Sequence, residues 1–509
     1  MKKTIVSLVV VLSAIVSFAQ TQQEKINKAI DQNQHELVKE FTNLLSIPNV
    51  AANPAGLKDN ANWLMQYMQD KGISNVQLLT LEKENVPAVV YGEVKVPGAK
   101  ETVIFYAHYD GQPVDTSKWY KGVHPFKPSL YSTSIDKGGS LIAWPEKENN
   151  YDPNSRIYAR GASDDKAGVM AIINAYATLK QLGIQPSVNI KFFFEGEEEA
   201  GSPNLEALLN KYKNILNSNL WIICDGPVHQ SSKKQLVMGV RGDTHLELTV
   251  FGPKRPLHSG HYGNWVLNPA MELARLLASM KNGQGEITIK GFYDDVIPLI
   301  PSEKEALSKI PAVEEQLKNE LGIQATERAG ALNDALQLPS LNVNGIQSAG
   351  VGKYSANVIP TKAIASIDLR LVKGNDWKRQ QDKVIDHIKA QGFFVTDKEP
   401  TDEQRKQNNK ICMVVASDGY NAQKTSLDNP FAKRINKAML NGLGAAPVLL
   451  PTLGGSLPLF VFEQDLNTQP ITVPIANHDN NQHAENENIQ LKNFFEGIQI
   501  FSAIMTVGK

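Results

Sequence analysis

The chain has 509 residues, of which 42% are hydrophobic and 21% are charged, the composition of a globular protein with material for more than one core. Its 52 Lys and Arg residues nearly balance its 53 Asp and Glu residues, so the formal net charge is -1. This balance excludes the strong global field that draws a protein to nucleic acid or to an anionic membrane, and we expect a small molecule as the partner.

The first 19 residues are predicted to be a signal peptide. Lys2 and Lys3 form a basic start, an apolar run covers residues 5–16, and a small residue, Ala19, precedes the expected cleavage point. No later run reaches about 18 uninterrupted apolar residues, so no membrane span is expected. The sequence therefore predicts an exported protein, either periplasmic or secreted.

Residues 20–241 are predicted to form the first part of a catalytic α/β domain. Residues 27–75 have the apolar spacing of amphipathic helices, and short apolar runs then alternate with a helical pattern over residues 166–182. This alternation indicates a mixed, largely parallel sheet. The strand-like runs are residues 86–94, 102–110, 187–196 and 219–226.

The pattern changes near residue 242, where THLELTVFG alternates between apolar and polar residues as a strand with one exposed face does. A helix, two strands, a second helix and a further strand follow, interrupted by a charged insertion over about residues 285–338. This order predicts a βαββαβ, ferredoxin-like domain over residues 242–410, inserted into the first domain. Residues 411–509 return to apolar strand-like runs and are expected to complete the catalytic domain.

Polar side chains follow several strand-like runs at the points where the strands are expected to end. Another pair of carboxylates, Asp164 and Asp165, stands directly before the predicted helix. Because the carboxyl ends of parallel strands share one edge of a sheet, these groups are expected to converge. The groups that follow strands are His108 and Asp110, the run Glu195–Glu199, Asp225, and the pair His478 and His483.

Each cluster has an ordinary structural explanation when it is taken alone. Asp164 and Asp165 would cap the helix, and Asp110 would form a polar pair with His108 in a turn. Together, however, so many converging carboxylates would repel one another and lose hydration without a cation. We therefore expect two divalent metal ions, Zn²⁺ first and Mn²⁺ or Co²⁺ as alternatives, because histidine combined with carboxylates suits these ions. Asp110 would then orient His108 through the ring nitrogen that binds no metal.

Seven motifs occur in the order AHYDGQPVD, RGASDDKAG, EGEEEAGS, CDG, HSG, LGGSLP and QHAENE, from about residue 105 to 485. In this order they resemble the di-zinc exopeptidases, a family that includes carnosine dipeptidase, the cytosolic non-specific dipeptidase, bacterial glutamate carboxypeptidase and aminoacylase. Each motif alone is a weak signal, but the ensemble is specific. The combination of RGxxDDK with GGSxP is most similar to the dipeptidase branch.

The resemblance implies a metal ligand set. Asp164 matches a carboxylate that bridges both metal ions. His108 and Asp225 would complete one site, and Glu199 and His483 would complete the other.

The resemblance also implies a general base, Glu198, which would take a proton from metal-bound water and return it to the leaving amine. Two choices of register stand behind these assignments. Glu197, Glu198 and Glu199 are consecutive, and alignment on the following A-G-S favours Glu198 as base and Glu199 as ligand. The trailing A-E-N-E favours His483 over His478.

The inserted domain resembles the dimerisation lid of the family, in which a histidine of one subunit reaches the active site of the other. His258 matches this histidine and would polarise the scissile carbonyl. Asn357 and Arg370 match substrate contacts, and Arg370 suits a bidentate grip on a peptide carboxylate. Gly455 and Ser456 would line the carboxylate pocket. The ordinary alternatives are a loop histidine and a surface salt bridge. A homodimer through the inserted domain is therefore expected.

The sequence thus predicts a secreted zinc-dependent exopeptidase that hydrolyses dipeptides or similar small peptides by attack of metal-bound hydroxide on the amide carbonyl. An N-acyl-amino-acid amidohydrolase or a desuccinylase would use the same site, and the sequence does not separate these activities. A non-catalytic metal-binding protein is the alternative from another class. It would lack the base or a ligand, and none is missing here.

Overall fold

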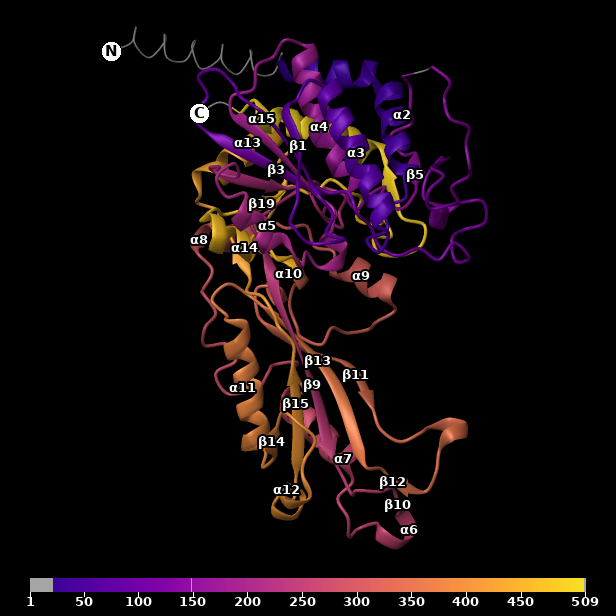
Figure 1. Cartoon of the computed structure of the whole chain (residues 1–509), viewed down its shortest axis with the longest axis vertical. Coiled ribbons are helices and arrows are strands. Elements are labelled where there is room, and N and C mark those ends of the chain that lie inside the picture. Colours follow the sequence, from indigo (N-terminus) through magenta and orange to yellow (C-terminus); the bar gives the residue numbers. More distant parts are fainter. Residues whose placement is uncertain (1–21, 148, 508–509) are drawn as a thin grey trace, which may run out of the picture. The chain divides into compact units, whose positions relative to one another are not determined.

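The computed structural model describes residues 22–147 and 149–507 of the chain (Figure 1). The predicted signal peptide, residues 1–19, lies outside the described residues. None of the described helices is both long and apolar enough to cross a membrane.

The chain divides into two compact units, each assembled from separate stretches of sequence. Unit 2 consists of Gly239–Lys424 and Pro451–Phe460. Unit 1 takes the residues up to Met238, Thr425–Leu450 and the residues from Val461 onward.

Unit 1 is built on an eight-stranded sheet whose centre is parallel. In spatial order its strands are β1 (Ser74–Leu79), β2 (Val89–Val94), β6 (Asn189–Glu195), β3 (Thr102–His108), β7 (Leu220–Ile223), β19 (Ile471–Thr472), β8 (Gln235–Val237) and β17 (Val448–Leu450). β3 runs parallel to both β6 and β7, whereas β1 and β2 form an antiparallel edge. The predicted mixed, largely parallel sheet is confirmed.

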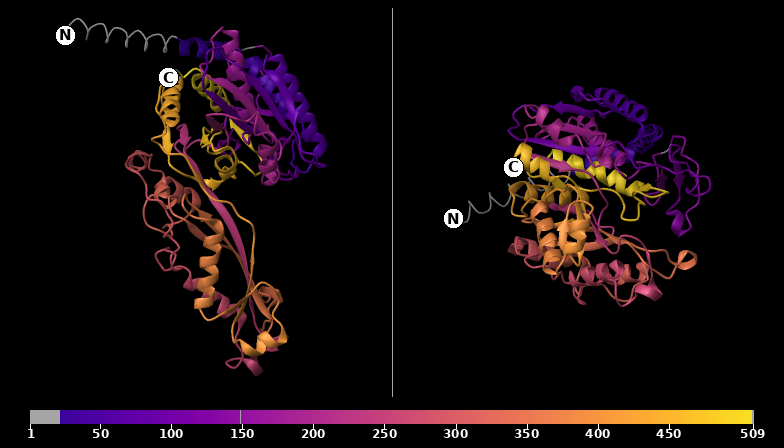
Figure 2. Two further views of the ribbon diagram at one scale, coloured as in Figure 1. Left: turned by 60° about the vertical axis from the view of Figure 1, so that its left-hand side comes forward. Right: turned by 60° about the horizontal axis from the view of Figure 1, so that its bottom comes forward.

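Helices pack against this sheet and against one another (Figure 2). α4 (Lys166–Gln181) packs on β3 and is buried on nearly every side, because α2 (Gln34–Leu45) and α15 (Leu491–Met505) cover it. α3 (Pro54–Asp70) packs on β1 and β2 and begins where the Asn53 side chain accepts the N–H of Gly56, as an N-cap does. Unit 1 also contains α5 (Leu205–Lys211) and α13 (Pro430–Leu443), and α14 (Phe460–Leu466) begins at its boundary.

A small three-stranded sheet in unit 1 joins two segments that are far apart in sequence. β5 (Arg156–Tyr158) pairs antiparallel with both β4 (Ser129–Tyr131) and β20 (Asn488–Gln490). β5 leads into the residues before α4, and β20 follows the QHAENE motif. The pairing therefore places these two motif-bearing segments side by side.

Unit 2 is built on a second sheet with the spatial order β11 (Ser340–Gln347), β13 (Lys362–Leu371), β9 (Gly239–Phe251), β15 (Ile411–Ala416) and β14 (Phe394–Thr396). β16 (Gln423–Lys424) and β18 (Leu453–Ser456) also pair with β9. α7 (Pro269–Ser279) and α11 (Trp377–Ala390) pack on this sheet and share one apolar core with it. The chain order β9, α7, β11, β13, α11, β14 is the predicted βαββαβ unit, and β15 is an additional strand between β9 and β14.

Short elements complete unit 2. β10 (Leu257–His258) pairs with β12 (Val358–Ile359), and α6 (Ser259–Tyr262) lies beside them at the end of unit 2 where β9 ends and β13 begins (Figure 1). The predicted charged insertion, residues 285–338, contains α8 (Pro301–Ser308), α9 (Glu314–Leu321) and α10 (Leu332–Ala335). α12 (Asp402–Gln407) precedes β15.

One predicted boundary differs from the structure. Residues from 411 onward were expected to rejoin the catalytic domain, but β15 pairs with β9 and β14 in the sheet of unit 2. The chain returns to unit 1 only at Thr425, and Pro451–Phe460 again belongs to unit 2 because β18 pairs with β9. The exposed Val415 explains the difference, because an apolar run on a half-exposed strand resembles a buried strand in sequence.

Candidate metal centre

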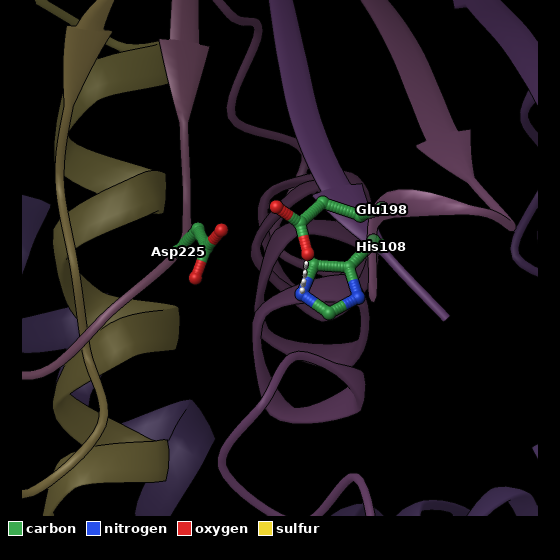
Figure 3. Close-up of side chains that lie close together, drawn as sticks. All are labelled: His108, Glu198 and Asp225. Carbon is green, nitrogen blue, oxygen red and sulfur yellow. Dashed lines mark ion pairs between the residues drawn. The ribbon is translucent and has the colours of Figure 1, made fainter. Parts of the chain in front are cut away.

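His108 ends β3 in the middle of the sheet of unit 1, and its side chain is fully buried. Its Nε2 atom lies 2.9 Å from Oδ1 of Asp164 and 3.9 Å from Oε2 of Glu198. Figure 3 shows Glu198 beside the imidazole ring, with Asp225 opposite them. Asp225 follows β7 and Glu198 follows β6, so three neighbouring parallel strands deliver an imidazole and two carboxylates to one edge of the sheet.

Asp164 stands between two histidines. One carboxylate oxygen, Oδ1, faces His108, and the other, Oδ2, lies 3.1 Å from Nε2 of His483. Nε2 of His483 also lies 3.1 Å from Oε2 of Glu199. The side chain of Asp164 is buried, whereas that of His483 is 54% exposed. His483 therefore closes the site from its solvent side.

The structure thus brings all five predicted metal ligands together, and Glu198 lies beside them. Two groups have donor atoms that all lie within 4.8 Å of one another: one is His108, Glu198 and Asp225, and the other is Asp164, Glu199 and His483. The prediction placed Asp164 rather than Glu198 beside His108 and Asp225. Because Asp164 Oδ1 is 2.9 Å from His108, Asp164 has one oxygen available to each group.

The side chains of the three consecutive glutamates point in different directions. Glu197 turns away from the histidines, since its two oxygens accept hydrogen bonds from the backbone N–H and the side-chain amide of Asn204. Glu198 begins the turn η2 (Glu198–Ala200) and points at His108, and Glu199 points at His483. Glu198 and Glu199 therefore face the two histidines, and Glu197 does not.

Asp110 is fully buried and contacts three parts of the site. Its Oδ1 lies 3.3 Å from Nδ1 of His108 and accepts the backbone N–H of Glu198 at 3.2 Å. Its Oδ2 accepts the backbone N–H of Glu199 at 2.9 Å. Asp110 therefore fixes both the imidazole and the turn that carries the two glutamates, which is more than the orienting role expected for it.

The carboxylates dominate the electrostatics around the histidines. Burial alone would lower the pKa of His108, but Asp110, Asp164 and the charge of Glu198 outweigh burial and raise it well above its ordinary value. The adjacent carboxylates of Asp164 and Glu199 raise the pKa of His483 to about 10. The site therefore favours positive charge.

Burial and mutual repulsion disfavour the charged forms of two carboxylates of the site. Burial, together with the charge of Asp164, raises the pKa of Asp225 to about 7. Burial also raises the pKa of Glu198 well above its ordinary range, opposed by His108 and reinforced by Asp225 and Asp164. Cations among these groups would relieve the mutual repulsion.

The donor set fits a pair of divalent metal ions. Imidazole nitrogens with carboxylate oxygens are the ligands that Zn²⁺, Mn²⁺ and Co²⁺ accept in proteins. Within the described part of the chain, the buried Oδ2 of Asp164 has no hydrogen-bond partner, although His483 Nε2 lies 3.1 Å away. A buried carboxylate oxygen and a ring nitrogen this close together, without a hydrogen bond between them, suit shared ligation of an ion.

Two of the predicted substrate contacts lie together at one end of unit 2. His258 is exposed, caps α6 through its Nδ1, which accepts the N–H of Gly260, and pairs with Val358 across β10 and β12. The exposed Asn357 precedes Val358, and its carbonyl accepts the N–H of Ser259 at 3.0 Å.

The other predicted contacts lie together at the opposite end of the same strands. Nη1 of Arg370 donates to Oγ of Ser456 at 2.8 Å, and its Nε donates to Asp368 at 3.1 Å. Gly455 is the exposed neighbour of Ser456 in β18. Arg370 pairs with Asp243 near the start of β9, whereas Lys362 pairs with Phe251 at its end. Eight residues of strand separate the two ends, roughly 25 Å.

Two residues with close contacts to the site were not predicted. Gln112 donates to Oε2 of Glu199 at 2.7 Å, and the fully buried Glu487 accepts the backbone N–H of Asp164 at 3.0 Å. Both lie inside motifs, AHYDGQPVD and QHAENE. A motif marks such a residue, but only the folded chain shows which ligand it supports.

The comparisons with known proteins agree with the motifs. A model of Peptidase family M20/M25/M40 matches residues 104–507. A Cys-Gly metallodipeptidase of Candida albicans is 26% identical over 96% of this chain and 97% of its own length. A Beta-Ala-His dipeptidase of Homo sapiens is 26% identical over 94% of this chain and 91% of its own length.

Among solved structures, an M20 family metallo-carboxypeptidase from Sulfolobus solfataricus has a TM-score of 0.74 and 28% sequence identity, covering 93% of this chain and 99% of that one. A dipeptidase from Saccharomyces cerevisiae has a TM-score of 0.71 and 24% identity, covering 95% of this chain and 98% of that one. These likenesses confirm the predicted fold class.

Proposed function

Because the chain belongs to peptidase family M20/M25/M40 and is a hydrolase of the metallo-exopeptidase kind, we propose that its substrates are dipeptides or similarly small peptides. The curated relatives that match nearly the whole chain include dipeptidases from fungi and mammals. Their names support a dipeptide substrate, and the motifs GGSxP and RGxxDDK point in the same direction.

The observation that carries the proposal is the position of Asp164 between His108 and His483. In the proposed enzyme Asp164 would be a ligand of both Zn²⁺ ions, His108 and Asp225 would complete the ligands of one, and Glu199 and His483 would complete those of the other. When bound, such ions activate water at neutral pH and polarise the carbonyl of the scissile bond.

Glu198 is the proposed general base. Its side chain is 14% exposed and faces the edge of the sheet where the histidines meet, so its carboxylate can accept a proton from the attacking water and return it to the leaving amine. Glu197 is committed to Asn204. Glu199 has Gln112 and His483 at its Oε2. Glu198 is thus the glutamate of the run that is best placed to exchange a proton.

Arg370 and Ser456 are the proposed contacts for the peptide carboxylate. The side chain of Arg370 is 34% exposed, and its hydrogen bond to Ser456 fixes the guanidinium group in place. A fixed guanidinium group binds a carboxylate through two parallel hydrogen bonds. Gly455 lies exposed beside Ser456, so no side chain there obstructs a ligand.

His258 and Asn357 are proposed to act on the site of a second copy of the chain in a homodimer. Within unit 2 they lie roughly 25 Å along the strands from Arg370 and Ser456, too far for a dipeptide to contact both pairs. One site would therefore take Arg370 and Ser456 from one copy and His258 and Asn357 from the other.

The test is a panel of dipeptides, tripeptides and N-acyl-amino acids, including succinylated ones, assayed on the purified protein with and without a metal chelator. We expect fastest cleavage of dipeptides, loss of cleavage with chelator, and recovery with added Zn²⁺. A preference for N-acyl-amino acids would mean that the enzyme is an amidohydrolase or a desuccinylase and not a dipeptidase. Cleavage unaffected by chelator would contradict the metal mechanism.

We also propose that the mature protein is exported to the periplasm or beyond the cell. The basic start and apolar run of residues 1–19 support this. N-terminal sequencing of protein recovered from periplasmic and extracellular fractions tests it, and we expect the mature chain to begin after Ala19. Intact Met1 on cytoplasmic protein would contradict it.

A further inference from the structure

Arg160 and Glu487 form a buried ion pair behind the candidate metal centre. Nη1 of Arg160 lies 2.8 Å from Oε2 of Glu487, and the two side chains are 3% and 0% exposed. Neither residue carries a role in the function proposed above. A buried ion pair is a weak argument for stability, so its presence at this place calls for a positional explanation.

The carboxylate of Glu487 accepts hydrogen bonds from the residues that lead into Asp164 and from Asp164 itself. Its Oε1 accepts the N–H of Asp164 at 3.0 Å, the N–H of Ser163 at 2.9 Å and the hydroxyl of Ser163 at 3.0 Å. Its Oε2 accepts the N–H of Gly161 at 3.0 Å in addition to Arg160. A carboxylate with this many donors, each on a defined side, holds residues 161–164 in one conformation.

Arg160 connects the same carboxylate to the loop of His483. Its Nη2 donates to the carbonyl of Ala484, the residue after His483, at 3.1 Å. The backbone of Glu487 also accepts the N–H of Ala159 at 3.1 Å. The ion pair is therefore joined by hydrogen bonds to Asp164 on one side and to the neighbour of His483 on the other.

His483 depends on this connection more than His108 does. Its side chain is 54% exposed and its backbone φ is 60°, so surrounding side chains contribute little to holding its ring in place. His108 is fully buried in a central strand and is contacted by Asp110. The position of His483 must therefore come from the backbone of its loop.

We propose that Arg160 and Glu487 are positioning residues that set the separation of Asp164 and His483 and thereby the affinity of the Asp164–Glu199–His483 group for its metal ion. The inference rests on the proposed two-metal function. It predicts unequal damage: loss of the ion pair weakens metal binding by this group more than on the His108–Asp225 side, which shares Asp164 but where Asp110 holds His108 independently of the ion pair.

The test counts Zn²⁺ bound to the metal-stripped full chain after dialysis against a series of buffered free Zn²⁺ concentrations. We expect two ions per wild-type chain. In Glu487→Gln the first ion binds within about threefold of the wild-type concentration, and the second requires about 10–100-fold more Zn²⁺, as is usual when a residue behind a metal ligand is changed.

Arg160→Lys is the second variant and covers the case in which Glu487→Gln does not fold. A single ammonium group cannot reach Glu487 and the Ala484 carbonyl as the forked guanidinium does, so the same selective weakening is expected. Glu101→Gln is the matched control. It breaks the ion pair of Glu101 with Arg434 before the start of β3, at the end opposite His108, and should leave both ions bound as in wild type.

Two results would overturn the inference alone: wild-type affinity for both ions in the folded variants, or equal weakening of both. A wild-type chain that binds one ion or none would instead overturn the proposed two-metal function, and this inference with it.

Discussion

Glu197 turns its carboxylate back to Asn204, which donates its backbone N–H to Oε1 at 2.9 Å and its side-chain amide to Oε2 at 3.0 Å. The carboxylate of the adjacent Glu198 instead faces His108, with its Oε2 3.9 Å from Nε2 of the imidazole. Neighbouring glutamates therefore have different environments, and substitutions of the same kind at the two positions should have different effects.

Glu198→Gln should lower kcat about 10²–10⁴-fold, the usual contribution of a general base, because an amide cannot take up the proton. The protein should still bind its metal ions. Steady-state kinetics on the best dipeptide, together with the Zn²⁺ count, checks this expectation.

Glu197→Gln is the matched control and should keep kcat within about threefold of wild type, because Glu197 only joins η2 to Asn204. If Glu197→Gln lost activity while Glu198→Gln kept it, the register of the glutamate run would be wrong.

Asp110→Asn should weaken metal binding about 10–100-fold, because it removes the negative charge beside Nδ1 of His108 and one of the two acceptors for the N–H groups of Glu198 and Glu199. The measurement is the free Zn²⁺ concentration that restores half of the activity to metal-stripped protein. Asp115→Asn is the control from the same motif, since Asp115 is half exposed and bonds only to Ser117 and Lys118 nearby. Equal Zn²⁺ requirements for the two variants would exclude a role for Asp110 in orienting His108.

Much of unit 1 could be predicted because its signals are local. β3, β6 and β7 are short apolar runs that end at polar residues, and the parallel order of such strands brings His108, Glu198 and Asp225 to one edge. The boundary near residue 411 could not be predicted in the same way. β15 belongs to unit 2 because it pairs with β9. This pairing leaves no periodic signal in residues 411–416 alone.

The residues around the ligands show the same division. The side chains predicted to bind metal stand in recognisable motifs, and the structure brings them together. Glu487 is in the QHAENE motif, but its contact with Asp164 joins positions 323 residues apart in sequence. Contacts of this kind depend on the pairing of β5 with β20, so they become visible only in the fold.

Mixing two inactive variants tests the proposal that His258 acts across a homodimer. Glu198→Gln and His258→Ala should each be nearly inactive. After the subunits are mixed and exchanged in equal amounts, about a quarter of wild-type activity should return, because about half of the dimers are then mixed and each has one intact site.

The control is each variant taken alone through the same exchange, which should give no recovery. If the mixture remained inactive while light scattering showed mixed dimers, His258 would not serve the site of a second copy.

Asp479 provides a pH dependence that is separate from the metal ligands. Burial alone would raise the pKa of Asp479, but hydrogen bonds and charge from Arg156, with Asn477 and Lys137, hold it well below its ordinary value. The folded chain therefore favours the charged form. The stability contributed by this group is present above the unfolded pKa near 3.9 and is lost as pH falls below it.

Asp479→Asn should lower the free energy of unfolding of metal-stripped protein by about 1–2 kcal/mol at pH 7, because the buried guanidinium of Arg156 loses its charged partner while Asp479 itself is partly solvated. The difference from wild type should narrow as pH falls below about 4, because the aspartate of the unfolded wild-type chain then takes up a proton while that of the native chain is still charged. Urea unfolding at pH 7, 5, 4 and 3 measures it. Asp386→Asn, at an exposed position paired only with Lys389 on α11, should show no such pH-dependent difference. A difference of constant size from pH 7 to 3 would mean that the Asp479 side chain acts through its shape and not through its charge.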